Sequence, residues 1–194
     1  MRNLVLLTII LSSSALFGQK IRFKVEGQND TIVNLVRYQG AKLYYADTAE
    51  VKKGIVEFDG SKHKPGIFAL FLPGQKMLEF IYNDEEVYIE ASKSDLVGTS
   101  VIKKSEENKV FLAYVKFMGS ERQKANKLVE KRKEFEVESK EYKTLTEDID
   151  ATTKKVIDYQ KDLIKNNADR LVGKIVKMSM DIEIPEAPRD EAGN

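Results

Sequence analysis

The 194-residue chain contains no cysteine and no tryptophan, and His63 is its one histidine. Without cysteine, the chain cannot form disulfide bonds, a thiolate nucleophile or a cysteine-based zinc site. With one histidine, it cannot form a histidine-rich metal site, and most acid–base designs that use imidazole are excluded. We therefore expect that this chain is not an enzyme and has no catalytic, cofactor-binding or metal-binding residue and no cofactor.

Charge of one sign is not in excess either, because 32 lysine and arginine residues stand against 31 aspartate and glutamate residues. Nucleic-acid binding would require a concentrated basic face. The basic triplet Lys131-Arg132-Lys133 is flanked by Glu130, Glu134, Glu136 and Glu138, which cancel its potential locally. We interpret the triplet as a solvated helix face rather than a phosphate-binding patch. We expect no nucleic-acid partner.

The front of the chain carries an apolar run, from Leu4 to Leu11, that is too short to cross a bilayer, which takes roughly 20 apolar residues. A basic residue, Arg2, precedes the run, and small and polar residues follow it as far as Gly18. This order is typical of a secretory signal peptide. We predict a signal peptide over residues 1–18, cleaved between Gly18 and Gln19. The mature protein is then periplasmic or secreted, with no integral membrane span.

The first half of the mature chain has the pattern of short β-strands. From Ile21, apolar and charged residues alternate with a period of two, which indicates a half-buried strand. Further candidate strands follow with glycine and proline turn signals between them: Thr31–Tyr38, Lys42–Ala46, Ile55–Phe58, Ile67–Leu72, Met77–Tyr82 and Val87–Ala91. We predict an α+β protein whose residues 19–104 form an antiparallel β-sandwich or small barrel of about seven strands. The apolar run Ile67–Leu72 is expected to be a central strand.

The second half has a helical pattern, because neither glycine nor proline occurs between Gly119 and Gly173. Apolar residues recur at every seventh position: Leu128, Phe135, Tyr142, Ile149, Val156 and Leu163. This spacing predicts one face of a long helical region over residues 105–180. The second apolar position of each heptad is poorly kept, which argues against a solitary coiled coil. We expect a helical hairpin, with one extended helix as the alternative.

The ends of the helical region also carry signals. Ser105 is expected to cap the first helix, and Glu106 and Glu107 follow in its first turn. A shorter helix is expected from Ala168 or Asp169 to Met180. The end of the chain, EIPEAPRDEAGN, contains two prolines and many charges. We predict that residues 181–194 are a linker or the truncated start of a further module.

Three groups of residues are candidates for a site, and each has a simpler interpretation. His63 lies between two lysines, so we interpret it as an exposed turn residue. The acidic stretch Asn83–Glu86 lacks the alternating ligands of a calcium loop, and we interpret it as a solvated turn rather than a weak calcium site. The aromatic residues of the strand half could line a ligand cleft, but we favour ordinary core packing. They are Tyr38, Tyr44, Tyr45, Phe58, Phe68, Phe71, Phe80, Tyr82 and Tyr88.

Several segments together carry a resemblance to a known family. They are Val25–Gly27, Lys42–Tyr45, Gly54–Gly60, Gly66–Leu70, Leu78–Ile81 and the helical stretch from Ser105 through Asn167. This pattern resembles the N-terminal domain of unknown function in exported Bacteroidota proteins that carry a thioredoxin-like or peroxiredoxin-like domain further along. In that family a Trp-Cys-x-x-Cys motif in the C-terminal domain performs the redox chemistry. This chain has neither residue type, so the resemblance implies no catalytic residue here.

Two functions of different classes follow from these observations. The leading hypothesis is a non-catalytic accessory or interaction domain of an exported thioredoxin-like thiol–disulfide oxidoreductase, whose partner is a protein or the C-terminal thioredoxin-like domain in cis. The alternative is a stand-alone periplasmic binding or chaperone-like protein with a β body and a helical arm. Residues 105–194 hold 18 basic and 19 acidic side chains, whereas such arms usually carry positive charge. A hydrolase ranks below both, because no pair of carboxylates lies in an apolar setting.

Overall fold

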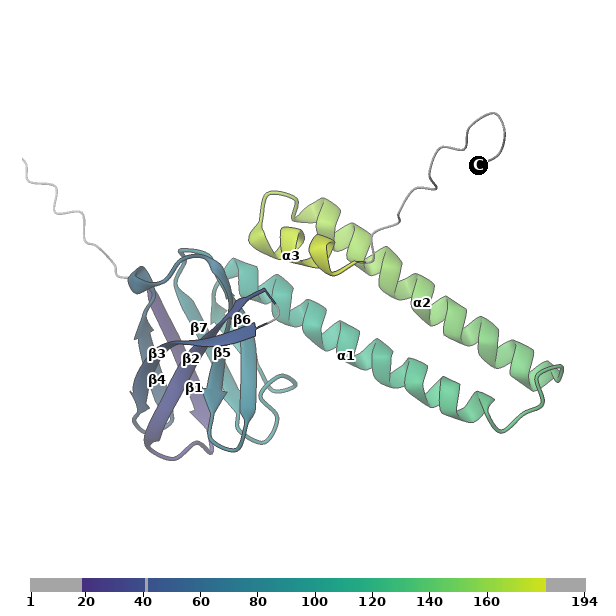
Figure 1. The fold of residues 1–194 in the computed structure, drawn as a ribbon, viewed down its shortest axis with the longest axis horizontal. Coiled ribbons are helices and arrows are strands. Elements are labelled where there is room, and N and C mark those ends of the chain that lie inside the picture. The colour runs from purple at the N-terminus through teal and green to yellow at the C-terminus, as the bar shows by residue number, and fades with distance from the viewer. Residues whose placement is uncertain (1–18, 41, 181–194) are drawn as a thin grey trace, which may run out of the picture.

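The computed structural model describes residues 19–40 and 42–180. The expected signal peptide, its cleavage site at Gly18 and the expected linker at 181–194 lie outside the described residues. The described chain forms eight strands followed by three α-helices, which confirms the α+β class (Figure 1). The β domain ends at Lys104, and the first helix begins at Glu106.

The eight strands form two sheets of four. Sheet A has the order β4-β1-β7-β8 and comprises β1 (Lys20–Glu26), β4 (Ile55–Asp59), β7 (Val87–Ser92) and β8 (Val101–Lys104). Sheet B has the order β3-β2-β5-β6 and comprises β2 (Thr31–Gln39), β3 (Lys42–Val51), β5 (Gly66–Leu72) and β6 (Lys76–Tyr82). A short 3-10 helix, η1 (Gly60–Lys62), follows β4. The described strands form no closed barrel, so the sandwich is correct and the barrel alternative is wrong.

The structure corrects the strand predictions in three places. The domain is not purely antiparallel, because β1 and β7 pair in parallel. Alternation of apolar residues does not encode strand direction, so the sequence pattern could not show this pairing. The strand β8 was not predicted, because it has no clear alternation and just one partly buried residue, Ile102. The strand β3 runs to Val51 rather than Ala46, since its pairing with β2 continues past an irregularity between Leu35 and Val36.

The core lies between the two sheets. Ile21, Phe23 and Val25 of β1 point inward, as their alternation predicts, and each is at most 2% exposed. The rings of Phe23 and Phe80 meet edge to face at 5.1 Å and so join the two sheets. Burial of each such side chain stabilises the fold by roughly 1.5–3 kcal/mol. The strand β5 lies between β2 and β6, which confirms the central strand expected at Ile67–Leu72.

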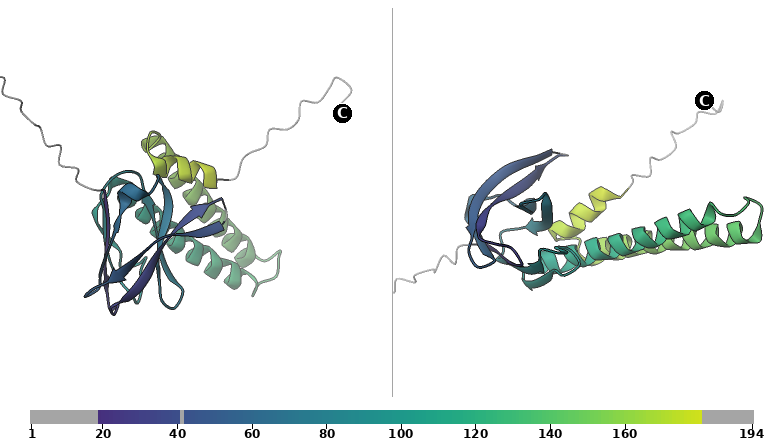
Figure 2. Two further views of the ribbon diagram at one scale, coloured as in Figure 1. Left: turned by 60° about the vertical axis from the view of Figure 1, so that its left-hand side comes forward. Right: turned by 90° about the horizontal axis from the view of Figure 1, so that it is seen from below.

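The helices are α1 (Glu106–Arg132), α2 (Lys140–Asn166) and α3 (Leu171–Ser179). The two long helices run side by side away from the sandwich as an arm, and α3 lies at the end of the arm nearest the sandwich (Figure 2). This arrangement confirms the hairpin and excludes one extended helix. No helix of the described residues is long and apolar enough to span a membrane.

Two helical details differ from the sequence prediction. The seven-residue repeat does not lie on one continuous helix, because Phe135 falls in the connection between α1 and α2. Within the hairpin, contacts between the helices include the stacked rings of Phe117 and Tyr159, whose centroids are 4.0 Å apart. The short helix begins at Leu171 rather than at Ala168 or Asp169, and its extended N-cap residue is Arg170.

Candidate functional site: a joint and two contrasting sheet faces

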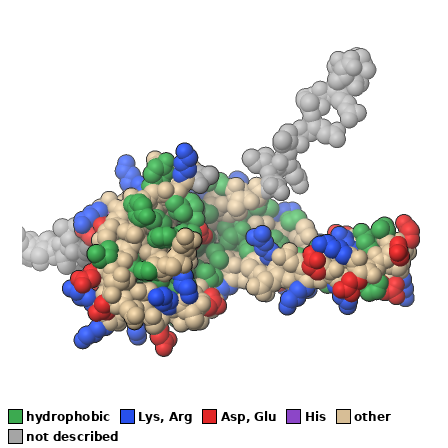
Figure 3. All heavy atoms as spheres, turned by 60° about the horizontal axis from the view of Figure 1, so that its bottom comes forward, with side chains coloured by type: hydrophobic (Ala, Val, Ile, Leu, Met, Phe, Trp, Pro, Cys, Tyr) green, Lys and Arg blue, Asp and Glu red, His purple; other side chains and the backbone are tan. Residues whose placement is uncertain are grey.

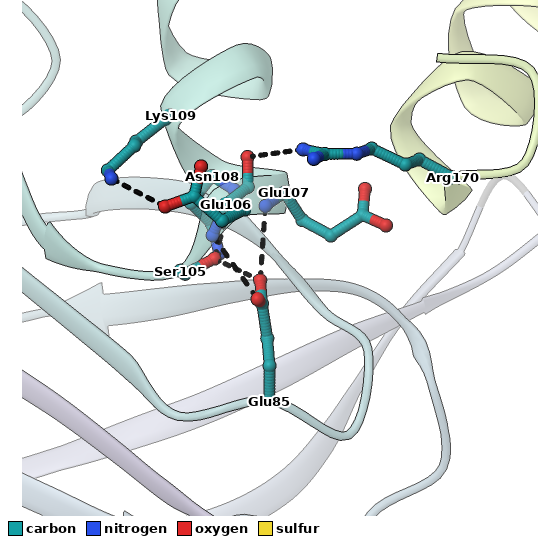
Figure 4. A network of polar contacts seen from close by, with 7 residues as sticks. All are labelled: Glu85, Ser105, Glu106, Glu107, Asn108, Lys109 and Arg170. Atoms are coloured by element: carbon teal, nitrogen blue, oxygen red, sulfur yellow. Dashed lines mark hydrogen bonds and ion pairs between the residues drawn. The ribbon is translucent and has the colours of Figure 1, made fainter.

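A cluster of buried and half-buried polar residues, which we call the joint, connects the β domain to the helices. It comprises Glu85, Ser105, Glu107 and Asn108 (Figure 4). The carboxylate of Glu85 accepts hydrogen bonds from the Ser105 hydroxyl and from the backbone N–H groups of Glu106 (3.2 Å) and Glu107 (3.1 Å). A carboxylate at the first turn of a helix is stabilised by the positive end of the helix dipole. Glu85 therefore fixes the start of α1 to the turn between β6 and β7.

The prediction that Asn83–Glu86 forms a solvated turn is therefore wrong for Glu85. Asp84 and Glu86 are exposed, and Glu86 pairs with Lys104 at 2.6 Å. Among the residues that the structure describes, no group of three or more histidine, aspartate and glutamate side chains could hold a metal ion. Ser105 caps α1 as predicted, since its hydroxyl accepts the Asn108 backbone N–H at 3.0 Å.

Asn108 completes the edge of sheet B. Its side chain is fully buried, and its amide oxygen accepts the Ile81 backbone N–H at 2.8 Å while its amide N–H donates to the Ile81 carbonyl at 2.6 Å. The strand β6 is an edge strand, whose outward peptide groups would otherwise lack partners. The Asn108 side chain therefore makes, at Ile81, the two hydrogen bonds that a neighbouring strand would make, and it holds α1 against the sheet.

Glu107 ties the third helix into the joint. The residue is 5% exposed, and its carboxylate accepts the backbone N–H groups of Leu171 at 3.0 Å and Val172 at 2.8 Å. The side chain of Asn83 donates to the same carboxylate at 3.0 Å. The N-cap residue of α3, Arg170, makes no side-chain cap of its own. The cap of α3 is therefore supplied by α1, so that the β6–β7 turn, α1 and α3 meet at one point.

The outer face of sheet B is largely apolar. On the strands of this sheet, Leu35, Leu70 and Leu78 point into the core, so their neighbours along each strand point outward. The outward apolar residues are Ile32, Val36, Leu43, Tyr45, Ile67, Ala69, Phe71, Met77 and Ile81, of which Val36, Ala69 and Ile81 are buried. The outward polar residues are Asn34, Tyr38, Thr48, Glu50 and Glu79. Ile32 and Tyr45 are 65% and 75% exposed. Hydrophobic side chains also gather visibly on the β domain in the space-filling view (Figure 3).

The outer face of sheet A is charged instead. Glu57 pairs with Lys20 at 3.2 Å and with Arg22 at 3.4 Å, and the Arg22 guanidinium lies over the Tyr88 ring. The Tyr88 hydroxyl donates to Glu90 at 2.6 Å, and this bond holds the pKa of Glu90 below its usual value. The two outer faces therefore differ in kind: that of sheet A is ion-paired, and that of sheet B carries exposed apolar side chains at Ile32, Leu43 and Tyr45.

The aromatic residues of the strand half divide between the core and the surface. Phe58, Phe68, Phe80 and Tyr82 are buried, as core packing predicts. Core packing is wrong for the other five, because Tyr44 and Tyr45 are 46% and 75% exposed and Tyr38, Phe71 and Tyr88 lie on the outer faces of the sheets. On the outer face of sheet B, the Tyr38 hydroxyl donates to Glu79. Burial and this bond to a carboxylate raise the pKa of Tyr38 to about 12.

His63 is not the exposed turn residue that its sequence neighbours indicated. Its side chain is 8% exposed, and its ring packs on Phe68 with centroids 5.6 Å apart. Its Nε2 atom lies 3.7 Å from an Asp47 carboxylate oxygen, beyond hydrogen-bond distance. The two lysines beside His63 in sequence suggested a solvated loop, whereas the tertiary fold brings Asp47 and Phe68 to it. No second imidazole exists to make a metal site with it.

The remaining candidates lie apart from one another. In the basic triplet, Lys133 pairs with Glu130 at 2.7 Å, and the Arg132 guanidinium lies over the Tyr142 ring of α2.

A cleft of about 710 Å³ lies beside the turn after β1. Its polar lining includes Lys24, Gln28, Lys53, Glu90, Ser92 and Thr99. This size lies within the usual range for a small-molecule site, but lysines and glutamates are mixed along the cleft.

Comparison with protein families adds one finding. Residues 20–111 match the family model described as Domain of unknown function (DUF4369). The match confirms a domain of unknown function in this part of the chain. The DUF4369 segment includes all the strands that the structure describes and the joint residues Glu85, Ser105, Glu107 and Asn108. Comparison with curated proteins and with solved structures found no match.

Proposed function

We propose that the protein is a non-catalytic accessory module of an exported thioredoxin-like thiol–disulfide oxidoreductase. Its outer face of sheet B binds a protein partner or the thioredoxin-like domain in cis. The observation that carries the proposal is the contrast between this exposed apolar face and the ion-paired face of sheet A. Large exposed apolar patches on soluble proteins usually mark interaction sites. The resemblance of the strand and helix segments to the family of exported redox proteins supplies the partner class.

The joint supports the same proposal. It holds α1 and α3 to the β domain through hydrogen bonds that involve buried groups, Glu107 and Asn108 among them. Such bonds restrict the direction of the helices relative to the sheets because every buried donor and acceptor must keep its partner. A module of this kind presents its apolar face and its arm to a partner in one fixed arrangement.

The first experiment is the intact mass of the protein exported by its own host, detected with an antibody against the β domain. The proposal expects a species well above the 22.1 kDa of this chain, because the thioredoxin-like domain follows in cis. A species below that mass would contradict the in-cis form.

The second experiment measures the disulfide-reductase activity of that longer protein with protein and small-molecule disulfides. Tyr45→Glu is expected to slow reduction of the protein substrate, because it places charge on the apolar face. The matched control is Val101→Glu, an exposed apolar residue of sheet A. It should leave both rates unchanged. Full activity and unchanged substrate choice after deletion of residues 19–180 would refute the proposal.

The alternative function, a stand-alone binding or chaperone-like protein, is favoured by the projecting arm and by the same apolar face (Figure 2). Light scattering of an unfolded client protein tests it directly. Suppression of aggregation that is lost in Tyr45→Glu and kept in Val101→Glu would support this alternative. A monomer that does not suppress aggregation would remove it.

A further inference from the structure

The outermost strand of sheet B, β3, has a long open edge. Sheet B has the order β3-β2-β5-β6, and in the described part of the chain no further strand pairs with β3. At the opposite edge, Asn108 of α1 bonds to Ile81 of β6, so the helices join the sandwich away from β3. The edge strands of sheet A, β4 and β8, have five and four residues, whereas β3 has ten. A long exposed edge is a template for pairing with another chain.

Three consecutive large side chains of β3 are exposed. Leu43, Tyr44 and Tyr45 are 44%, 46% and 75% exposed. Among the described residues, no other strand carries more than one large apolar side chain that is this exposed. Tyrosine is also a residue that favours strand pairing. The exposed edge of β3 is therefore the part of the β domain best suited to accept another strand.

The pairing of β3 with β2 fixes the side to which each residue points, because opposite residues in an antiparallel pair share one face of the sheet. Leu43 and Tyr45 lie opposite the outward residues Tyr38 and Val36. Ala46 is the extra residue at the irregularity of this pairing, so it shares one position of the ladder with the residue that follows it. Three other residues of β3 point to the inner side: Lys42, Tyr44 and Asp47.

We propose that a second copy of this chain pairs with the edge of β3 in antiparallel orientation, about a two-fold axis midway between the two Tyr44 residues. In such a pairing, residues equally spaced on either side of the axis lie opposite each other. Leu43 of each copy then lies opposite Tyr45 of the other on the outer face. Lys42 lies opposite the position that contains Asp47, so that an ion pair forms at each end of the ladder. The two copies of sheet B become one continuous sheet.

The charges of β3 fit a second copy. Lys42 is exposed and makes no ion pair with any residue that the structure describes. The nearest basic atom recorded for Asp47 is Nε2 of His63, at 3.7 Å, beyond hydrogen-bond distance. Because a two-fold axis repeats every contact, one register brings Lys42 and Asp47 together twice.

The side chains also select this register from the alternatives. Like faces must lie opposite each other, which limits where the axis can fall. An axis at Asp47 would place the apolar Leu43 opposite Glu50. An axis at Leu43 or at Tyr45 would leave Lys42 without a carboxylate opposite it. The inference does not depend on the proposed function, because the pairing uses the edge of β3 and leaves the outward side chains of β5 and β6 uncovered.

Charge reversal tests the pairing in the full mature chain. Sedimentation equilibrium at low ionic strength should show a monomer–dimer equilibrium. Lys42→Glu and Asp47→Lys should each raise the dimer dissociation constant about tenfold, because each places like charges opposite each other at both ends of the ladder. An equimolar mixture of the two variants should recover the wild-type constant, since both ion pairs are restored between unlike chains.

The matched control is Lys124→Glu, which makes the same change of net charge at an exposed position of α1. It should leave the dissociation constant unchanged. A wild-type chain that stays monomeric at all concentrations would overturn the inference, as would an equal effect of Lys124→Glu. A monomeric chain whose β3 amides become protected from hydrogen exchange when a different protein is added would assign the edge to that protein instead.

A cysteine at the axis tests the register, since the chain has no cysteine of its own. Tyr44→Cys should form a disulfide between two copies about tenfold faster under mild oxidation than Thr48→Cys. Thr48 is an exposed residue of the same strand. In the proposed register its two copies lie about 20 Å apart along the ladder, at about 3.3 Å per position. Equal rates, or faster linkage at Thr48, would overturn the inference even if both proteins were dimers.

Discussion

At the scale of single residues, a few buried polar side chains contribute more to the stability of the fold than their number suggests. Asn108 pairs with both backbone groups of Ile81, and Glu107 accepts two N–H groups of α3. Each side chain pairs with backbone groups that would otherwise lack a hydrogen bond. Leaving one such buried group unpaired lowers the free energy of unfolding by about 1–3 kcal/mol. These residues are therefore sensitive to substitution although none of them has an assigned chemical role.

Replacement of Asn108 by leucine keeps a similar volume but leaves the Ile81 N–H and carbonyl without partners. We expect the free energy of unfolding to fall by roughly 2–4 kcal/mol, measured by urea denaturation. The neighbouring variant Lys109→Ala removes an exposed ion pair with Glu106 and should change it by less than about 0.5 kcal/mol. If both variants behave alike, the pairing with Ile81 does not stabilise the fold.

Ionisation of Tyr38 should make the free energy of unfolding depend on pH in the alkaline range. Its pKa is about 12 in the folded protein, because of burial and the bond to Glu79, and about 10 in an unfolded chain. The folded state thus favours the neutral phenol. This contribution to stability is fully present below about pH 10 and is lost as the pH rises toward about 12. The unfolding free energy of the wild type should therefore fall between about pH 10 and 12 relative to that of Tyr38→Phe.

Absorbance near 295 nm measures the same group directly. Tyr38→Phe should remove one late-titrating phenol from the alkaline absorbance curve. Tyr82 and Tyr159 also have raised pKa values through burial, so the comparison must be made as a difference between the two proteins. An early-titrating phenol missing from the variant would show that the bond to Glu79 is not formed in solution.

At the scale of elements, the ends of the helices determine how they pack. The helix α3 has no side-chain cap of its own and depends on Glu107, and it returns against α2 through a tight corner at Asn167–Arg170. Gly173 lies where this corner approaches α3 most closely. A Cβ atom there would come within 2.0 Å of the Asn167 carbonyl oxygen. The corner therefore requires glycine at this position for reasons of space.

Two glycine substitutions make a matched test of this contact. Gly173→Ala should lower the free energy of unfolding by roughly 1–3 kcal/mol, because the α2–α3 corner must shift. Gly119→Ala on α1 meets no atom within 4 Å and should raise it by about 0.5–1 kcal/mol, since alanine favours a helix interior. Thermal unfolding measures both effects. A gain in stability from Gly173→Ala would mean that the corner is more open than described.

At the scale of the whole molecule, the structure is a compact body and a projecting arm (Figure 1). The arm is connected to the body mainly at the joint and along β6, and therefore the joint determines its direction. We therefore expect an intact joint to hold the apolar outer face of sheet B and the tip of the arm in one relative position.

Glu85→Ala should loosen this unit, since it removes the acceptor for Ser105, Glu106 and Glu107 together. Spin labels at Lys62→Cys in the body and Val137→Cys at the arm tip report the distance between the two parts. We expect a broader distance distribution in Glu85→Ala than in the wild type. Glu86→Ala, an exposed neighbour paired with Lys104, is the matched control. Equal widths would show that Glu85 does not hold the arm in place.

The sequence by itself determined the elements whose signals are local. Alternation located most strands, the lack of glycine and proline located the helical half, and Ser105 marked the start of α1. Only the tertiary structure decided which segments meet: the parallel pairing of β1 with β7, the contact of His63 with Asp47, and the cap that Glu107 provides for α3. The physical reason is that propensities and caps depend on neighbours along the chain, whereas pairing and burial depend on groups brought together from distant positions.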